Sequence, residues 1–156
     1  MFRSLFAIFA LVATCSPLSI VRKDVVAKSN NPFGTVDPVT SCGGIGNQIA
    51  LRVSECEGSC TFEPGKIYNC EADFMPGSGS SSLSLWVEIC RRNDCSIIVR
   101  TELPNSSVLP GLVYTVKYDI VPNDMFSGEI IEFRTYIYHT ESYLMETCVS
   151  ADVNIL

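Results

Sequence analysis

Three observations predict an all-β sandwich. After residue 41, short apolar runs rich in β-branched and aromatic residues alternate with polar turns. Within the runs apolar residues recur at every second position, and no segment shows the three-to-four-residue spacing of an amphipathic helix. From residue 42 onward the cysteines occur as a single residue, a close pair, a lone residue, a second close pair and a single residue near the end: Cys42, Cys56 with Cys60, Cys70, Cys90 with Cys95, and Cys148. This combination is typical of a secreted β-domain held by disulfide bonds.

The start of the chain has the composition of a secretory signal peptide over residues 1–15. Arg3 is basic, residues 5–12 are apolar, and residues 13–15 are small enough for cleavage, which could also fall as late as residue 19. Residues 20–40 are broken by Pro32, Gly34 and Pro38, so we interpret them as an irregular N-terminal extension. Residues 41–156 then form one domain.

The charge balance excludes one class of partner. The chain carries 11 basic and 17 acidic residues, a net charge of -6, and removal of Arg3 with the signal peptide makes it about -7. Nucleic-acid binding depends on clustered Lys and Arg, which this chain lacks, so no nucleic-acid partner is expected. The sequon at Asn105 lies between two apolar runs and predicts N-glycosylation on an exposed turn.

Seven strands are expected, at residues 48–54, 66–74, 83–90, 96–101, 112–121, 129–139 and 148–155. Glycine, proline and asparagine mark the turns between them, at residues 63–65, 76–79, 110–111 and 122–124. Alternation then assigns the inward faces. The residues placed inward are Ile49, Leu51, Val53, Tyr68, Cys70, Ala72, Phe74, Leu83, Leu85, Val87, Ile89, Tyr114, Val116, Tyr118, Ile120, Ile131, Phe133, Thr135, Ile137, Val149, Ala151, Val153 and Ile155.

The spacing of the cysteines favours local bridges, although sequence alone leaves other connectivities open. Each close pair can bridge a tight turn, whereas a bond from Cys42 to Cys148 would tie the first strand to the last. Closing that loop of roughly 100 residues stabilises a fold by about 4–5 kcal/mol in the chain-entropy model. Cys70 is left over on an inward face, where we expect a small buried side chain with an unreactive thiol.

Several short motifs occur in a common order. They are Ser-Cys-Gly at residues 41–43, Val-Ser-Glu-Cys at 53–56, Pro-Gly-Lys-Ile-Tyr at 64–68, Pro-Gly-Leu-Val-Tyr at 110–114, and Cys148 seven residues before Ile155. In these motifs and in its cysteine spacing, the chain resembles the ML family of lipid-recognition domains over residues 41–156. That family includes the Niemann-Pick type C2 sterol carriers, MD-2-like proteins and mite group 2 allergens.

The resemblance implies an immunoglobulin-like sandwich of two sheets with an apolar cavity between them, which holds one lipid. It implies the disulfide bonds Cys42–Cys148, Cys56–Cys60 and Cys90–Cys95. It also implies a lipid-binding role for inward residues, together with a rim of three residues beside the entrance. The residues expected to bind lipid are Leu51, Tyr68, Ala72, Phe74, Leu85, Val87, Tyr114, Val116, Tyr118, Ile120, Phe133, Ile137, Val149 and Val153, with Val121, Pro122 and Phe126 at the rim.

Two functions are compatible with these features. The first is a secreted carrier of sterol, fatty acid or a similar apolar lipid. The second is an innate-immune recognition module that binds a microbial glycolipid or a receptor ectodomain. For either we expect an extracellular or lysosomal monomer without a cofactor, in transient contact with a membrane or receptor. Alternation alone does not separate a cavity from a filled core, since both need the same inward residues.

The residues offer little support for catalysis or metal binding. His139 is the only histidine, and no Gly-x-Ser-x-Gly motif accompanies it. The paired carboxylates, Glu55 with Glu57 and Glu71 with Asp73, lie on polar faces or turns, so we interpret them as solvated charges. The cysteine spacing differs from the two-residue knuckle of zinc sites. We therefore expect neither an enzyme nor a metal site.

Overall fold

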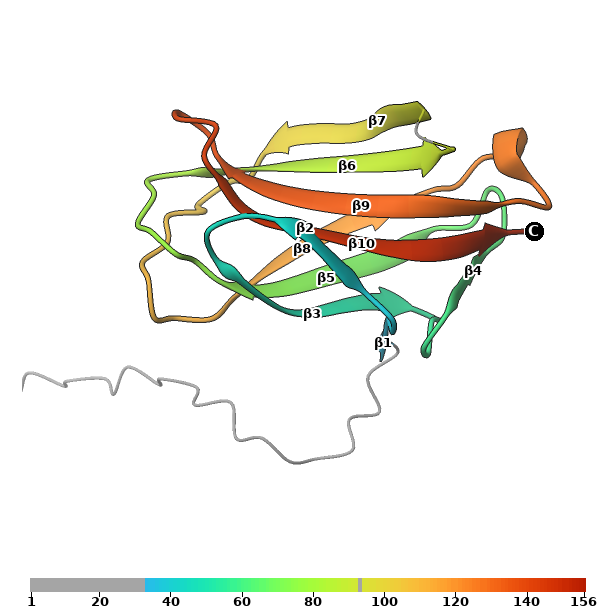
Figure 1. Cartoon of the computed structure of the whole chain (residues 1–156), viewed down its shortest axis with the longest axis horizontal. Coiled ribbons are helices and arrows are strands. Elements are labelled where there is room, and N and C mark those ends of the chain that lie inside the picture. Colours follow the sequence, from blue (N-terminus) through green and yellow to red (C-terminus); the bar gives the residue numbers. More distant parts are fainter. Residues whose placement is uncertain (1–32, 93) are drawn as a thin grey trace, which may run out of the picture. The chain divides into compact units, whose positions relative to one another are not determined.

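The structure is a computed structural model that describes residues 33–92 and 94–156. The predicted signal peptide and residues 20–32 of the predicted extension lie outside the described residues. All described residues belong to one unit, Asn31–Leu156, which forms two packed sheets (Figure 1). In this part of the chain no helix is long and apolar enough to cross a membrane.

One sheet has four strands and the other has six. The order in the first is β1 (Phe33–Thr35), β3 (Asn47–Ser54), β5 (Tyr68–Met75) and β8 (Tyr114–Ile120). The order in the second is β2 (Thr40–Gly43), β10 (Met145–Ile155), β9 (Ile130–His139), β6 (Leu83–Arg91) and β7 (Asp94–Glu102), with β4 (Cys60–Phe62) pairing in parallel with β10. A one-turn 3-10 helix, η1 (Asp124–Phe126), connects β8 to β9. The prediction of an all-β sandwich is confirmed.

All seven predicted strands are present, and three further strands were missed. β1, β2 and β4 are only three or four residues long, too short for an alternating pattern to be recognised. β1 corrects the interpretation of residues 20–40 as irregular, because Phe33–Thr35 pairs with β3 and Val36 is buried in the core. The described end of the predicted extension is therefore part of the sandwich.

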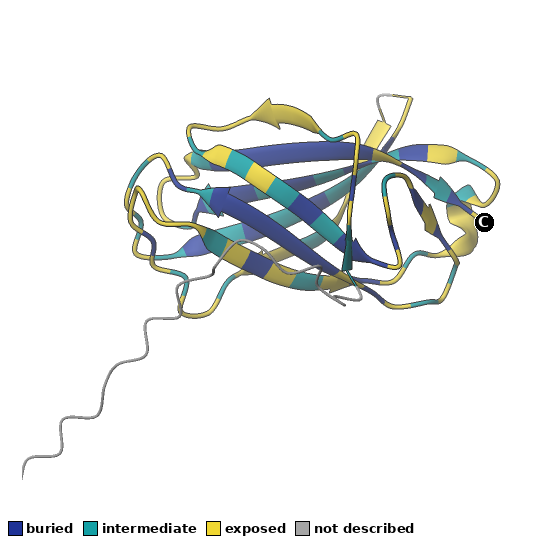
Figure 2. Cartoon of the chain, turned by 90° about the horizontal axis from the view of Figure 1, so that it is seen from below, coloured by how far each residue is buried: buried dark blue, intermediate teal, exposed yellow. Residues whose placement is uncertain are grey.

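Alternation assigned most of the core correctly, and Figure 2 shows buried residues alternating with more exposed ones along the strands. Ile49 is an exception, with 51% of its surface exposed. The pairing of β3 with β5 shifts register between Gln48 and Ala50, so the period breaks at Ile49 and this side chain leaves the inward face. Three other predicted inward residues are only partly buried: Ile89, Tyr114 and Tyr118.

Three disulfide bonds connect the strands, and they are the pairs that the resemblance implies. Cys42–Cys148 joins β2 to β10, Cys56–Cys60 closes the turn before β4, and Cys90–Cys95 joins the paired ends of β6 and β7. Cys70 is the only free cysteine among the described residues, and it is buried. Burial raises the pKa of its thiol to about 12, which agrees with the expected unreactive side chain.

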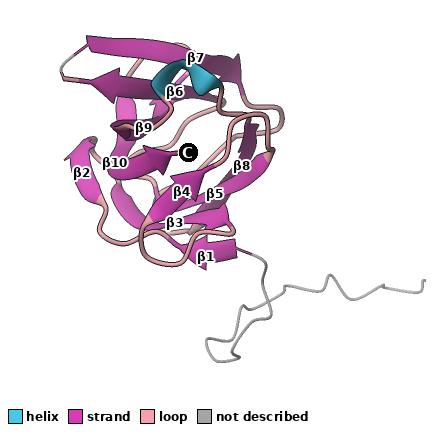
Figure 3. Ribbon diagram, turned by 90° about the vertical axis from the view of Figure 1, so that its right-hand side faces the viewer, coloured by secondary structure: helices cyan, strands magenta, loops and turns pink. Residues whose placement is uncertain are grey.

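On one side of the sandwich, β7 and β8 are the edge strands of the two sheets (Figure 3). Every residue of β7 is exposed except Val99, which is half-buried. The four-stranded sheet therefore leaves β7 uncovered. Access to the space between the sheets is expected along this side.

Candidate functional site

A small apolar pocket lies between the sheets at the end that carries η1. Its volume is about 80 Å³, and it is lined by Phe62, Ile89, Ile98, Ile120, Val121, Pro122, Asn123, Phe126, Ile131, Phe133 and Ile155. Pro122 has no backbone N–H to continue β8, and the Asn123 side chain accepts a hydrogen bond from the Met125 backbone N–H at 3.1 Å. These two residues turn the chain so that Phe126 faces the pocket.

A second pocket, of about 350 Å³, opens beside β8 at the opposite end of the sandwich. Its lining includes Phe74, Leu83, Tyr114, Val116 and the segment 103–108. Two backbone hydrogen bonds pair Ser80 with Val108. In addition, the Ser106 hydroxyl accepts a hydrogen bond from the Leu83 backbone N–H at 2.8 Å. The segment that covers this pocket is thus tied to the six-stranded sheet.

Between the two pockets, a polar contact joins the sheets. The hydroxyl groups of Tyr118 on β8 and Thr135 on β9 lie 2.6 Å apart. Cys70 is the partner of Tyr118 in the pairing of β5 with β8. Burial is the main cause that raises the pKa of the Tyr118 hydroxyl well above its ordinary value, and the charge of the nearby Cys70 is the second cause. This hydroxyl therefore stays neutral and serves as a hydrogen-bonding group.

The seventeen residues predicted to bind lipid divide into three groups. Five line the first pocket: Ile120, Val121, Pro122, Phe126 and Phe133. Three line the second: Phe74, Tyr114 and Val116. The other nine line neither pocket and belong to the core or pack against it: Leu51, Tyr68, Ala72, Leu85, Val87, Tyr118, Ile137, Val149 and Val153.

Among the described residues, the pockets at the two ends of the sandwich share no lining residue, whereas the resemblance implies a single chamber. Both Phe62 and Phe133 line the first pocket, where their rings pack edge-to-face with centroids 6.2 Å apart. The sequence interpretation omitted Phe62, Ile98 and the segment 103–108. Neither Phe62 nor this segment lies in a predicted strand, so alternation carried no signal for them.

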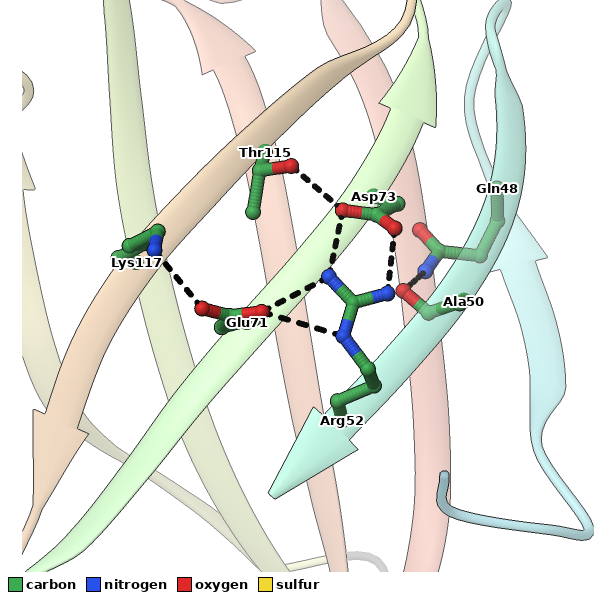
Figure 4. Close-up of polar contacts among 7 residues, drawn as sticks. All are labelled: Gln48, Ala50, Arg52, Glu71, Asp73, Thr115 and Lys117. Atoms are coloured by element: carbon green, nitrogen blue, oxygen red, sulfur yellow. Dashed lines mark hydrogen bonds and ion pairs between the residues drawn. The ribbon is translucent and has the colours of Figure 1, made fainter. Parts of the chain in front are cut away.

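The outer face of the four-stranded sheet carries a charged network around Arg52 (Figure 4). The Arg52 guanidinium on β3 donates to Glu71 at 2.9 Å and to Asp73 at 2.8 Å, both on β5. Lys117 on β8 pairs with Glu71 at 2.9 Å, and the Thr115 hydroxyl donates to Asp73 at 2.6 Å. Glu71 and Asp73 are buried, which corrects their interpretation as solvated charges. They lie on the polar face, as predicted, but their partners cover them.

This network predicts a loss of stability in acid. Burial alone would raise the pKa of Glu71, but hydrogen bonds from Lys117 and Arg52 outweigh it, so the pKa lies below its ordinary value. A carboxylate whose pKa is lower in the folded state than in the unfolded state stabilises the fold at pH values above its unfolded-state pKa. This contribution to stability is lost as the pH falls through the folded-state pKa. Arg52→Met is expected to destabilise the protein by about 2 kcal/mol at pH 7 and by clearly less near pH 3. Urea unfolding at the two pH values measures both differences.

The matched control is Arg91→Met, which removes one partner of the more exposed Arg91–Glu129 pair. A change within about 0.5 kcal/mol is expected at either pH, because exposed pairs contribute little. An equal loss at pH 7 and pH 3 for Arg52→Met would show that packing, and not ionisation of the carboxylates, explains the effect.

A second buried polar cluster surrounds Glu146 on β10. Its carboxylate contacts His139 Nε2 at 2.5 Å and accepts from the Ser78 hydroxyl at 3.1 Å and the Gly77 backbone N–H at 2.8 Å. The Ser78 hydroxyl lies 3.4 Å from the same Nε2 atom. A catalytic relay needs the serine and the acid on opposite nitrogens of the imidazole, so this cluster has the geometry of a structural contact.

Two other groups are candidate sites, one for glycosylation and one for a metal ion. Asn105 is exposed in the turn that covers the second pocket, so its side chain is accessible, and its glycosylation stays a prediction. Among the described residues, Glu88, Cys90 and Cys95 are close enough to hold a metal ion. The two cysteines are bonded to each other, and thus do not act as thiolate ligands.

No family model matches the chain, and no curated protein sequence matches it significantly. A Niemann-Pick type C2 protein from the Japanese carpenter ant matches its structure with a TM-score of 0.61 and 13% identity, over 75% of this chain and 98% of that chain. The C-terminal domain of wzt matches with a TM-score of 0.56 and 14% identity, over 79% and 81%. Chicken MD-1 complexed with lipid IVa matches with a TM-score of 0.48 and 11% identity, over 76% and 94%.

At these identities the likeness concerns the fold. The match spans almost the whole of the ant protein and three quarters of this chain. The chain therefore has the two-sheet sandwich fold of a Niemann-Pick type C2 protein, the fold that its resemblance to the ML family implies.

Proposed function

We propose that the protein is a secreted lipid-binding protein of the ML family, which carries an apolar lipid between its two sheets. The observation that carries this proposal is the pair of pockets at the two ends of the sandwich, which are lined mainly by apolar side chains, although the second also borders Thr115 and Lys117 on the outer face of β8. The motifs at residues 41–68 and 110–114 and the three disulfide bonds support it. A monomer in the extracellular fluid or the lysosome is the proposed form.

Transfer of the lipid from water or membrane is driven by burial of its apolar surface. If about 300 Å² is buried at ~25 cal/mol/Å², the gross gain is about 7 kcal/mol before the costs of ordering the ligand. Val121, Met125 and Ile130 are exposed beside η1, close to the first pocket. These side chains provide an apolar rim for contact with a membrane while the lipid passes.

Native mass spectrometry of the secreted protein before and after solvent extraction tests this proposal. A bound lipid is expected to appear as a mass that solvent removes. Displacement of the fluorescent probe 1-anilinonaphthalene-8-sulfonate by octadecanoic acid gives a second measurement. The proposal fails if no lipid-sized mass is lost and neither the probe nor the fatty acid binds.

Filling the second pocket is expected to weaken lipid binding. Val116 is buried on its wall, so Val116→Trp adds a large ring to the space that a chain would occupy. The affinity for octadecanoic acid should fall about tenfold or more, as measured by probe displacement. The matched control is Val113→Trp, since Val113 is exposed. Equal affinities for the two variants would contradict the assignment of this pocket.

A further inference from the structure

We propose that Tyr118 is a gate that divides the interior and sets the length of the alkyl chain that the protein accepts. This inference rests on the proposed lipid-binding function. In the closed form the Tyr118 side chain separates the two pockets. In the open form the side chain turns outward and the pockets join.

The position of Tyr118 on β8 is the first support. Inward residues alternate along this strand, so Tyr118 lies between Val116 and Ile120. Val116 lines the second pocket and Ile120 lines the first, whereas Tyr118 lines neither. The tyrosine therefore stands at the boundary between the two spaces.

The contact with Thr135 is the second support. Thr135 is 1% exposed on β9 in an interior that is otherwise largely apolar, and the Tyr118 hydroxyl is its side-chain partner at 2.6 Å. A buried hydroxyl without a partner is costly, so this bond holds the tyrosine across the gap. The bond spans the two sheets and acts as a latch for the closed form.

The position of β8 at the edge of its sheet supplies the path for movement. β8 is the edge strand of its sheet and Tyr118 is half-buried, so its ring is next to the side that β7 leaves uncovered. A rotated side chain could thus reach water, where its hydroxyl is satisfied. No backbone hydrogen bond of the sheet has to break for this change.

Joining the pockets changes the ligands that fit. From Tyr114 to Ile120 a strand extends about 20 Å, comparable with the length of an extended octadecanoyl chain. A short chain such as octanoic acid fits within one pocket and binds either form. A long chain needs the open form, so its apparent affinity is reduced by the fraction of molecules that are open.

Two variants that remove the latch test the gate: Tyr118→Phe and Thr135→Val. Each keeps the shape of the side chain and deletes one hydroxyl. Displacement of 1-anilinonaphthalene-8-sulfonate measures the affinities for octanoic and octadecanoic acid. Both variants should bind octadecanoic acid about fivefold more tightly, while their affinity for octanoic acid stays within about twofold.

Tyr136→Phe is the matched control, because the Tyr136 hydroxyl bonds Glu88 on the outer face at 2.8 Å. It should change neither affinity, and near-ultraviolet circular dichroism checks that all variants fold. Unchanged octadecanoic acid binding in both latch variants would overturn the gate. Weaker binding would also overturn it, since the two hydroxyls would then contact the ligand. Failure of the wild-type protein to bind either acid would instead overturn the proposed lipid-binding function.

Discussion

Replacing both Cys42 and Cys148 by alanine is expected to lower the free energy of unfolding by about 4–5 kcal/mol. The bond closes a loop with a sequence separation of 106 residues, so its loss releases a large conformational entropy in the unfolded chain. It also ties the edge strand β2 to β10. Urea unfolding at neutral pH measures the change, and a domain of ordinary stability would be left close to unfolding.

The double alanine variant at Cys90 and Cys95 is the control. This pair is only five residues apart, for which the same model gives about 2 kcal/mol. The difference between the two double variants therefore tests the entropic explanation. Equal losses would mean that local strain or packing, rather than loop length, determines the contribution of each bond.

Glu146→Ala is expected to destabilise the protein by about 3–5 kcal/mol. Glu146 is 0% exposed. Its carboxylate contacts His139 and accepts hydrogen bonds from the Ser78 hydroxyl and the Gly77 backbone N–H. Removing it leaves these groups without their acceptor, and His139, itself buried, has the least access to replacement water. Thermal and urea unfolding would both detect the loss.

Two comparisons separate this effect from a general one. Glu146→Gln keeps an oxygen acceptor and the shape of the side chain, so about half of the loss is expected. Glu141→Ala removes an exposed carboxylate from the adjacent turn and should change stability by no more than about 0.5 kcal/mol. If Glu146→Ala lies within about 1 kcal/mol of the wild type, the cluster is not a structural contact.

The strands of the sandwich were predictable because their signal is local. In β9 the residues Ile131, Phe133 and Ile137 recur at even spacing and all are buried. The same spacing in β8 predicted Val116 and Ile120 correctly. The strands β1, β2 and β4 are too short to show a period, and the position of Ile49 depends on a bulge in the pairing with β5.

The candidate site was predictable only in part. The inward position of Val116, Ile120 and Phe133 is a property of single strands, and these residues do line the pockets. Whether an inward residue borders a pocket or fills the core depends on the volumes of its neighbours in the opposite sheet. Phe62, which narrows the first pocket, lies on β4, a strand that no local pattern indicates.

The sequence by itself determined the class of fold, the faces of the long strands and the cysteine spacing, because each depends on neighbours within a few residues. Tertiary structure alone decided that Glu146 is buried against Ser78, 68 residues away, and that Arg52 covers Glu71 and Asp73. It also decided that the Tyr118 hydroxyl on β8 meets the Thr135 hydroxyl on β9. Such contacts arise when two sheets pack, and their energies depend on distances between side chains that are remote in the sequence.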